Sequence, residues 1–524
     1  MRTENENEGS TMKGQARAWR HAPARTGRRA PLAALAAVAL LLLAGCAVGP
    51  HYEVPVDAPV SIAAPEQALF APDAVQRDWW RQLEDPQLDA LIERALTANH
   101  DIRIAQARLL EARAAQTEAG LDRWPTVTLG ASRTRSIAQG NGTPADARTL
   151  AQSSRAGFDA AWEIDLFGRL QRLDEAATAR AEAQAADLEQ ARIVVVAELA
   201  RNYYEMRGAE QRLAVTQRTL QSLQDGLRVT EVQVGTGRGL AGDLASARAN
   251  LASTEGQLPV LETARRQAAH RVAVLAGLRP AELEPMLSPQ PLRVLARRLP
   301  VGDLGDLLRR RPDVLRAERG LAAGTADVGA ATAELYPRLD VGGFLGFVAL
   351  RGSDLGSASS RAFSLMPGLG WPALRLGSAR ARLRGAEARA QGERALYEQT
   401  VLRAIEDVEN ALTGYGQNQQ RLRSLVQASE QSRRAAELAE VRYREGAAPY
   451  LDMLDAQRTL LRAQDAVAEA ETASYTSLVA LYKAMGGGWQ APETAAGRAG
   501  EPSARAGNAS WGLSGAPAQR SPGT

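Results

Sequence analysis

The sequence contains little of the side-chain chemistry on which most enzymes and metal proteins depend. Cys46 is the single cysteine among 524 residues, so no disulfide can form within the chain. The four histidines are scattered without metal-ligand spacing, and no nucleophile is paired with a base. Aromatic residues make up only 5% of the chain. These absences argue against an enzyme, an envelope hydrolase included, and against a bound metal or other cofactor.

Cys46 follows directly on a short apolar run. Residues 31–43 are apolar throughout and come after a basic segment. The run is too short to cross a bilayer comfortably as a helix, but it has the length of the core of a secretory signal. An incidental or buried cysteine is the alternative. We therefore expect residues 1–45 to be a signal peptide, with either Met1 or Met12 as its start.

The tetrapeptide Leu43-Ala-Gly-Cys46 resembles the lipobox of bacterial lipoproteins, in which the chain is cut before the cysteine and the thiol takes a diacylglycerol. The resemblance implies several acyl chains on Cys46, which give a stable anchor where a single chain would be marginal. A residue other than an acidic one, Ala47, follows the cysteine. In lipoproteins of this kind, that implies sorting to the outer membrane.

Removal of the expected signal peptide changes the charge balance. The full chain has a formal net charge of +3 and a pI of about 9.1. Residues 1–45 hold seven basic and three acidic residues, so the mature chain is close to −1. The basic pI therefore gives no support for a nucleic-acid partner.

Two very long segments lack proline and carry a helical pattern. Between Arg169 and Val234, apolar residues recur every seven positions: Leu199, Met206, Leu213, Leu220, Leu227 and Val234. A heptad repeat predicts a helix in a coiled-coil-like array. About 65 residues at 1.5 Å each give a rod of about 100 Å, longer than any ordinary domain core. Residues 378–445 form a second such segment, with Ile405, Val408 and Leu412 on one face.

The sequence also repeats itself. Asp101 and Asp313 each precede a helix that ends in an aromatic residue and proline, and they lie 212 residues apart. Trp162 and Trp371, like Asp243 and Asp452, lie 209 residues apart. A half of about 210 residues has therefore been duplicated in tandem. Each half is expected to contain a helix, two strands, a long helix, a tight turn and a return helix.

The expected boundaries follow from this repeat. The first repeat, 46–300, is expected to contain strands at about 125–135 and 156–167, a long helix at 169–234 and a return helix at 242–277. The second repeat, 301–489, is expected to contain strands at about 338–349 and 363–376, a long helix at 378–445 and a return helix at 450–486. Residues 490–524, rich in Ala, Gly, Pro and Ser, are expected to be a disordered tail.

The predicted strands alternate between apolar and charged residues. Phe158, Trp162 and Ile164 face one way, whereas Asp159 and Glu163 face the other. Strands of about ten residues with this pattern are typical of a transmembrane β-barrel with a water-filled lumen. A soluble, half-buried sheet is the alternative. The segments 136–155 and 351–361 between strand partners are expected to be outward-facing loops. Pro372 falls inside the last predicted strand, where proline favours an edge or a bulge.

Four strands cannot close a barrel. An open sheet edge in lipid leaves unpaired N–H and C=O groups that cost several kcal/mol each. A four-stranded membrane sheet must therefore close with strands from other copies of the chain. This reasoning predicts an oligomer but leaves the number of copies open.

Several motifs occur in an order that resembles a known family. They are Cys46–Tyr52, Trp79-Trp80 with Asp85-Pro86, Trp162–Gly168, Tyr450–Gln457 and Leu481–Trp489. Together they resemble the outer-membrane efflux proteins of the TolC and OprM type, in particular their lipoprotein branch. The resemblance extends over nearly the whole mature chain.

This resemblance implies a mostly α fold with a small β part. Three copies would form a twelve-stranded transmembrane β-barrel, four strands from each chain, continued by a long α-helical coiled-coil barrel through the periplasm. The implied partners of the homotrimer are the lipid of the outer membrane, a periplasmic adaptor protein and an inner-membrane pump. The chain would then be a passive exit duct without catalytic residues, anchored in the outer membrane.

Each long helix is followed by a glycine-containing turn. In the family these turns form the periplasmic end that docks with the adaptor, so Gly237, Arg238, Leu240 and Gly446 are candidate contacts. The alternative is that the turns only close helical hairpins. The first turn also contains the pattern G-x-G-x-x-G, but a nucleotide-binding loop follows a strand, whereas a heptad-patterned helix precedes this one.

Asp452 and Asp455 lie three residues apart at the start of a predicted helix, so both point to one side. The simpler interpretation is that acidic residues in a first turn favour the helix dipole. The family pattern implies instead that they face the pore near its narrow end, where three chains would stack two rings of carboxylates. Tyr450 and Asp243 are the expected partners in holding this periplasmic gate shut.

The main alternative to a duct is a structural or adhesive coiled-coil lipoprotein without a pore. Among ducts, drug efflux, metal export and protein secretion all remain open. The chain has only seven methionines and four histidines, and no cluster of them suggests metal cargo. We expect small amphiphilic compounds as cargo, moved by a proton-driven pump.

Overall fold

The computed structural model describes residues 47–54, 69–71, 73, 76–138, 149–288, 290, 292, 298–302 and 310–488. Cys46, the expected signal peptide and the expected tail lie outside these residues. The chain divides into two compact units. The sheet unit contains residues 1–49, 122–172 and 329–380, and the helical unit contains 50–121, 173–328 and 381–524.

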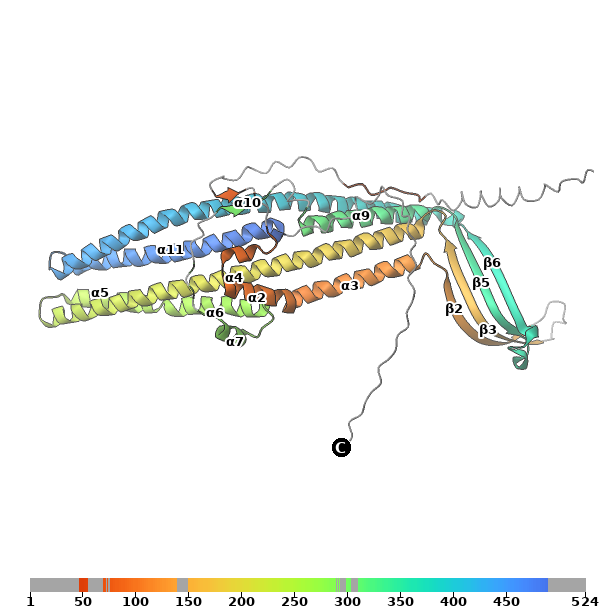
Figure 1. The fold of residues 1–524 in the computed structure, drawn as a ribbon, viewed down its shortest axis with the longest axis horizontal. Helices are drawn as coiled ribbons and strands as arrows, with labels where there is room; N and C mark the ends of the chain where they lie inside the picture. The colour runs from red at the N-terminus through yellow and green to blue at the C-terminus, as the bar shows by residue number, and fades with distance from the viewer. Residues whose placement is uncertain are drawn as a thin grey trace, which may run out of the picture. The chain divides into compact units, whose positions relative to one another are not determined.

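The sheet unit is built on one four-stranded antiparallel sheet in the order β2-β3-β5-β6 (Figure 1). Its strands are β2 (Thr126–Ala138), β3 (Thr149–Ile164), β5 (Arg338–Ala349) and β6 (Arg361–Gly370). Within the described residues, β2 and β6 have a partner strand on one side only. Both outer edges therefore present unpaired backbone groups.

The expected boundaries were wrong for three of the four strands. The first strand continues to Ala138 and the second begins at Thr149 and ends at Ile164, so both take residues that were expected to lie in the loop 136–155. The last strand ends at Gly370 instead of continuing to 376. Pro372 follows it and cannot donate to the ladder. The proline inside β6 is Pro367, and an edge strand tolerates it.

The strand registers collect the apolar residues on one face. Leu129 lies opposite Phe158, Phe158 opposite Leu345, and Leu345 opposite Phe363, so one apolar row crosses all four strands. All four side chains are exposed in the single chain. We call this side of the sheet the apolar face.

The opposite face carries a packed polar cluster over two glycines. Gly157 lies opposite Gly346, and a Cβ on Gly157 would come within 2.5 Å of a backbone oxygen. The ring of Phe344 covers this pair and is buried. The Arg155 guanidinium lies 3.9 Å from the centre of that ring and donates to Asp159. The charges of Arg155 and Asp159 therefore lie on the face opposite the apolar row, as the alternation predicted for Asp159.

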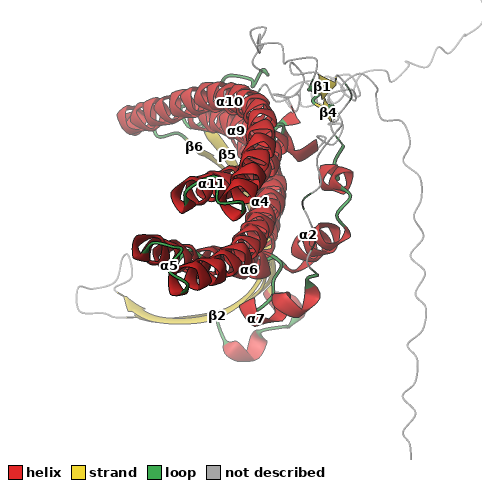
Figure 2. Ribbon diagram, turned by 90° about the vertical axis from the view of Figure 1, so that its left-hand side faces the viewer, coloured by secondary structure: helices red, strands yellow, loops and turns green. Residues whose placement is uncertain are grey.

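The helical unit contains most of the chain. Its long elements are α3 (His100–Leu121), α4 (Arg169–Gly235, which begins in the sheet unit), α5 (Ala241–Glu255), α6 (Leu258–Leu275), α9 (Pro312–Ala333, which ends in the sheet unit), α10 (Leu376–Arg444, which begins in the sheet unit) and α11 (Tyr450–Ala484). With 67 and 69 residues, α4 and α10 each extend about 100 Å. Seen along their axes, the helices lie side by side in a curved layer (Figure 2).

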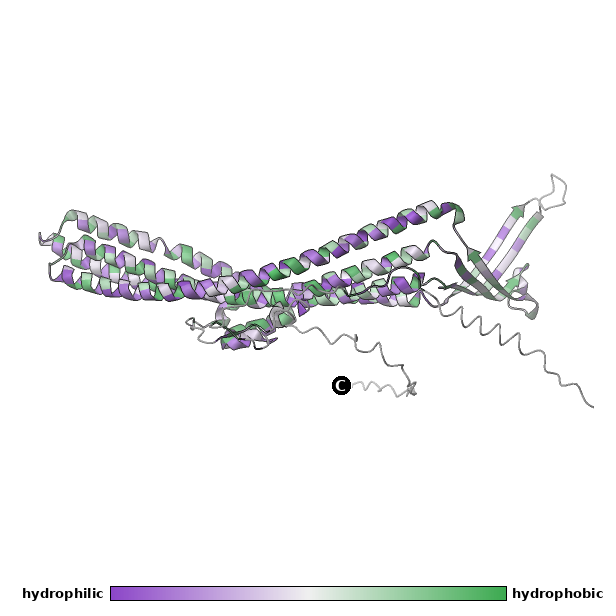
Figure 3. Cartoon of the chain, turned by 90° about the horizontal axis from the view of Figure 1, so that it is seen from above, coloured by the Kyte–Doolittle hydropathy of each residue, from purple (hydrophilic) through white to green (hydrophobic). Residues whose placement is uncertain are grey.

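The heptad residues of α4 form the buried stripe that the sequence predicts. Leu199 and Met206 are fully buried, Leu220 is 7% exposed, and the remaining heptad positions are half-buried. Between them the helix surface is polar, and Figure 3 shows hydrophilic and hydrophobic residues interspersed along the helices. None of the helices in the described residues offers the length and apolarity that a bilayer crossing requires.

The return helix of the first repeat is broken, which corrects the expected single helix at 242–277. α5 ends at Glu255, and α6 begins at Leu258 with Pro259 in its first turn. A proline lacks the N–H that a helix interior needs but is tolerated in a first turn. The corresponding helix of the second repeat, α11, contains no proline and runs unbroken.

The duplication is visible in equivalent contacts. Trp162 donates its indole N–H to the Arg123 carbonyl at 3.1 Å, and Trp371 donates to the Leu335 carbonyl at 3.1 Å. A second pair of equivalent contacts lies in the helical unit. In the first repeat, the Asn99 side-chain amide donates to the carbonyl of Leu275, the last residue of α6.

At the position equivalent to Asn99, a buried Arg311 donates to the carbonyl of Ala484, the last residue of α11. Asp313 and Asp407 accept from the same guanidinium. Both repeats therefore make the same connection, from a side chain before one helix to the last carbonyl of the return helix, but with different side chains.

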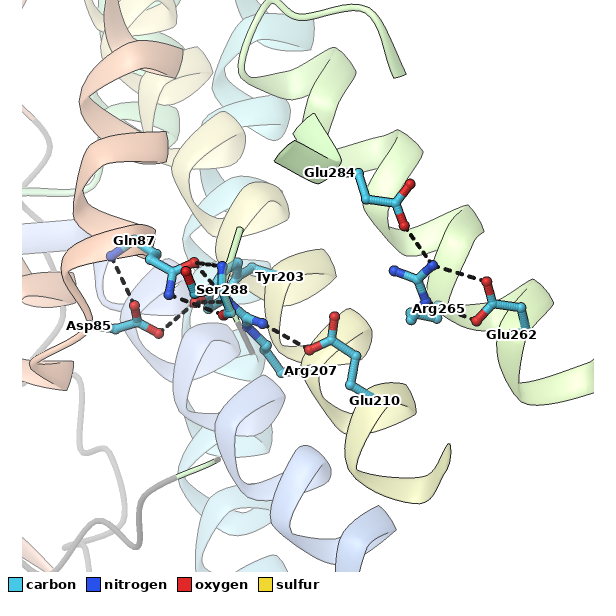
Figure 4. A network of polar contacts seen from close by, with 9 residues as sticks. All are labelled: Asp85, Gln87, Tyr203, Arg207, Glu210, Glu262, Arg265, Glu284 and Ser288. Carbon is cyan, nitrogen blue, oxygen red and sulfur yellow. Dashed lines mark hydrogen bonds and ion pairs between the residues drawn. The ribbon is translucent and has the colours of Figure 1, made fainter. Parts of the chain in front are cut away.

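A polar network fastens short elements beside α4 (Figure 4). Asp85 caps α2 (Pro86–Ala98) by accepting from Gln87 N and also accepts from Tyr203 Oη at 2.7 Å. Arg207 donates to the Tyr203 hydroxyl and to the Gln87 side chain. Burial, with the hydrogen bond to Asp85, raises the pKa of Tyr203 far above its usual value, so the phenol remains a donor.

A second set of contacts in Figure 4 joins α6 to the short 3-10 turn Glu284–Met286. Arg265 donates to Glu262 and to Glu284, both at about 3 Å. Hydrogen bonds from Arg265 and Arg266 lower the pKa of Glu262 to about 2. The remaining described strands, β1 (Phe70–Ala71) and β4 (Leu299–Pro300), form a small parallel pair.

Candidate functional site

The two glycine turns share one geometry. Gly237 and Gly446 have φ of +74° and +72°, and they lie 209 residues apart in the chain. Arg238 N donates to Gln233 O, and Ala447 N donates to Arg442 O, both at 2.8 Å. These are the paired capping bonds that end a helix with a glycine in the left-handed region. The turn of each repeat is therefore fixed by its backbone.

The side chains at these turns are open to solvent. Leu240 is 72% exposed and Arg238 is exposed. A Cβ added at Gly237 or Gly446 would meet nothing within 4 Å. The turns therefore require glycine for its φ and present a free surface around it.

A cluster behind the turns joins the two hairpins. Tyr450, the first residue of α11, is only 4% exposed and packs with Met453, Leu454 and Ala247. The ring of Tyr443 meets it edge-on with centroids 5.5 Å apart. The Tyr443 hydroxyl also donates to the side chain of Gln233, the residue whose carbonyl closes the first turn. The ends of α4 and α10 are thereby linked.

Tyr450 is a buried phenol with acidic neighbours. Burial raises its pKa, and Tyr443 and the half-buried Asp243 raise it further. The structure therefore places Tyr450 and Asp243 in one environment. Thr230 of α4 is also buried, and its hydroxyl donates to the Gly226 carbonyl.

Asp452 and Asp455 lie on the other side of α11 from this cluster. Both are exposed, and both line a groove of about 540 Å³ between α10 and α11 together with Gln431, Ser432 and Thr459. Within the described residues no cation pairs with either carboxylate. The structure thus brings the two aspartates together, but it separates them from Tyr450 and Asp243.

The sequence analysis missed a polar latch between the two return helices. Arg458 Nε donates to Asn250 Oδ1 at 2.9 Å and so joins α11 to α5. Asn250 is 8% exposed and lies seven residues after Asp243, on the same helix face. A buried amide on that face was the available signal. Leu451, 57% exposed beside Asp452, was also missed.

The described residues contain no group of three or more His, Cys, Asp or Glu side chains that could hold a metal ion. The chemistry that the site offers is therefore that of carboxylates along a groove, a buried phenol, and one Arg–Asn hydrogen bond between helices.

Comparison with known proteins finds relatives for both repeats. The family model described as Outer membrane efflux protein matches residues 91–278 and 304–487. The chain is 32% identical over 470 residues to the pyoverdine export outer membrane protein OpmQ of Pseudomonas aeruginosa, covering 86% of this chain and 96% of OpmQ. It is 31% identical over 454 residues to the outer membrane protein OprJ of the same species, covering 86% and 94%.

Solved structures agree with these matches. The outer-membrane channel OprN superimposes with a TM-score of 0.83 at 45% identity, covering 85% of this chain and 100% of OprN. Together, the matches confirm a mostly α, TolC-like fold with a small β part and a tandem duplication.

The turn geometry makes a prediction for Gly446. Gly446→Ala places an L-residue at positive φ, at a cost of about 1–2 kcal/mol. Local opening of the turn should then increase about five- to thirty-fold. Trypsin cleavage after the adjacent Arg444, followed by mass spectrometry, measures this opening.

Gly392→Ala is the matched control, because Gly392 lies inside α10 at an ordinary helical φ with open space around it. It should leave cleavage after Arg444 unchanged and stabilise the helix by roughly 0.5–1 kcal/mol. Equal cleavage rates in the two variants would contradict the assigned role of the turn glycine.

Proposed function

Because the chain belongs to the outer membrane efflux protein family, it is a non-enzymatic channel component of the outer membrane, and we propose that three copies form the exit duct of a tripartite system for small amphiphilic compounds. The observation that carries the proposal is the four-stranded sheet with two open edges and one apolar face. A poreless adhesive lipoprotein gains no support from these relatives.

The apolar face has the dimensions of a membrane band. From the row of Ile164, Leu339 and Leu369 to the row of Ala156 and Phe347, the registers span eight residues. At about 3.4 Å per residue this is about 27 Å along the strands. The apolar band of transmembrane barrels is about 25 Å tall.

One end of this band is rich in exposed aromatic residues. At the end joined to helices lie Trp124, Trp162, Tyr336 and Trp371, each more than a third exposed. Tyrosine and tryptophan are favoured where lipid meets water. These exposed aromatic side chains therefore support placing this end of the sheet at the periplasmic interface of the bilayer.

Closure supports the trimer. Each sheet offers β2 at one edge and β6 at the other. Three such sheets, joined edge to edge, make a twelve-stranded barrel, and an even strand number is the rule for bacterial outer-membrane barrels. The curved layer of helices would continue below as the wall of a tunnel (Figure 2).

The residues after Cys46 support a lipid anchor. Val48 N donates to Phe167 O at 3.2 Å, and a Cβ on Gly168 would come within 2.7 Å of the Ala47 side chain. Ala47 is thereby held just beyond β3, at the end of the sheet that joins the helices. Acyl chains on the preceding cysteine would enter the inner leaflet beside the barrel.

The hairpin ends support a gate. In a trimer, Asp452 and Asp455 would bring three copies of each carboxylate around one axis, where like charges attract cations. The Arg458–Asn250 latch and the Tyr450 cluster would hold the hairpins of each chain in the closed arrangement. Arg238 and Leu240, exposed at the turn, would remain available to an adaptor protein.

The relatives support small organic cargo. Their names refer to pyoverdine export and to antibiotic and toluene efflux. Passive conduction needs energy from elsewhere, which we assign to a proton-driven inner-membrane pump.

The anchor is tested at Cys46. Wild-type protein from cells grown with labelled palmitate should carry the label and gain the mass of its acyl chains. Cys46→Ser should carry neither. Equal labelling of both proteins would show that the lipid is attached to a residue other than Cys46.

The gate is tested by conductance in planar bilayers. Replacing Asp452 and Asp455 with Asn should raise the Mg²⁺ concentration for half-block by on the order of tenfold or more, because the carboxylates that attract the cation are gone. Glu430→Gln with Glu440→Gln removes two exposed carboxylates of α10 outside the groove and serves as the control. If Mg²⁺ blocks the aspartate variant at the same concentration as wild type, the groove carboxylates do not form the gate.

The cargo is tested in cells that lack the gene. They should become hypersensitive to amphiphilic antibiotics, solvents and detergents but not to metal salts, and the wild-type gene should restore resistance. Hypersensitivity to metals alone, or purified protein that passes no current, would overturn the proposed function.

A further inference from the structure

The apolar face carries a hollow that the channel function does not use. Its volume is about 710 Å³, and its walls include Leu129, Phe158, Leu345 and Phe363, the row that crosses all four strands. The backbone of Gly157 and Gly346 and the small side chain of Ala156 contribute to its lining. A hollow with these walls fits a hydrocarbon chain.

Arginines lie directly beyond this hollow, towards the end of the sheet that is not joined to the helices. Arg361 belongs to the next row, opposite Phe347, and it lines the hollow itself. Arg133 lies one row further, opposite Ser154. Successive rows are about 7 Å apart, and residues of both rows share the apolar face.

These two arginines are exposed and unbalanced. Among the described residues, neither has an ion pair, and none of the residues in their two rows is acidic. Arg135 and Arg351, both exposed, lie near the same end of the sheet. A guanidinium in a band that otherwise faces hydrocarbon needs an anion, and a phosphate accepts its paired N–H donors.

We infer that this end of the apolar face binds a phosphate-bearing lipid of the outer leaflet, with its phosphate on Arg361 and Arg133 and one acyl chain in the hollow. The direction is consistent, because a lipid of that leaflet has its head group outermost and its chains pointing inward, as the arginines and the hollow are arranged. The inference rests on the proposed function in that the sheet must lie in a bilayer.

The charge pattern distinguishes this occupant from others. A neutral lipid would satisfy the hollow and leave the arginines without partners. A free phosphate would satisfy the arginines and leave the apolar walls exposed. Only a molecule with both parts matches the surface, and clusters of basic residues beside an apolar band are the usual recognition signal for anionic lipids.

The test uses the full-length protein in nanodiscs of phosphatidylcholine that contain a tenth of bisphosphorylated lipid A. Lipid A retained on the protein after detergent extraction is counted by mass spectrometry. Wild type should be enriched in lipid A at least fivefold over the nanodisc composition. Arg133→Gln with Arg361→Gln should lose this enrichment.

Two further variants separate charge from chain binding. Ala156→Leu fills the hollow without touching the arginines and should at least halve the enrichment. Arg108→Gln with Arg113→Gln removes two exposed arginines of α3 and should match wild type. Inorganic phosphate at 10 mM should not displace the lipid; displacement would show a site for free phosphate and overturn the lipid assignment.

Conductance of the same samples separates the two proposals. A wild-type protein that conducts but shows no enrichment, or a double variant that retains it, contradicts the lipid site and leaves the duct standing. A protein that neither enters the nanodisc nor conducts contradicts the proposed function, and the lipid site falls with it.

Discussion

Unpaired backbone groups at the edges of β2 and β6 are the constraint on which the rest depends. Water can satisfy such groups at a protein surface, but lipid cannot, and each would cost several kcal/mol there. The sheet has an apolar face about as tall as the hydrocarbon band and too few strands to close on itself. Assembly is therefore a condition for placing this sheet in a membrane at all.

The helical part follows the same logic of repetition. Each repeat supplies two strands, one helix of nearly 70 residues and a glycine-closed turn, so one duplication yields two matched hairpins. Asn99 and Arg311 show how the copies have diverged while keeping the same joint. The return helices have also diverged: the first is broken at Pro259, and the second is continuous. The aspartate groove lies beside the continuous helix.

Sequence patterns predicted the fold where one periodic signal dominated. The heptads of α4 and the alternation around Phe158 were sufficient, since each reports directly on which face is buried or apolar. Boundaries were harder, because Thr149–Arg155 is mostly polar and shows no clear alternation. Pairing with β2 nevertheless extends the strand through all of it, and pairing with β5 begins at Ser154.

The candidate site was only partly predictable for a related reason. The spacing of Asp452 and Asp455 placed them on one side of a helix, but which neighbour covers that side is decided by tertiary packing. The Arg458–Asn250 latch joins residues 208 positions apart. An amide on the helix face of Asp243 marks one partner, but no local pattern identifies the other.

Amide hydrogen exchange of the purified protein in detergent tests the central claim most directly. If neighbouring copies complete the sheet, the outward-pointing amides of β2 and β6 will exchange as slowly as those of β3 and β5, in a particle with the mass of three chains. Fast exchange along both outer strands, in a particle with the mass of one chain, would contradict the account.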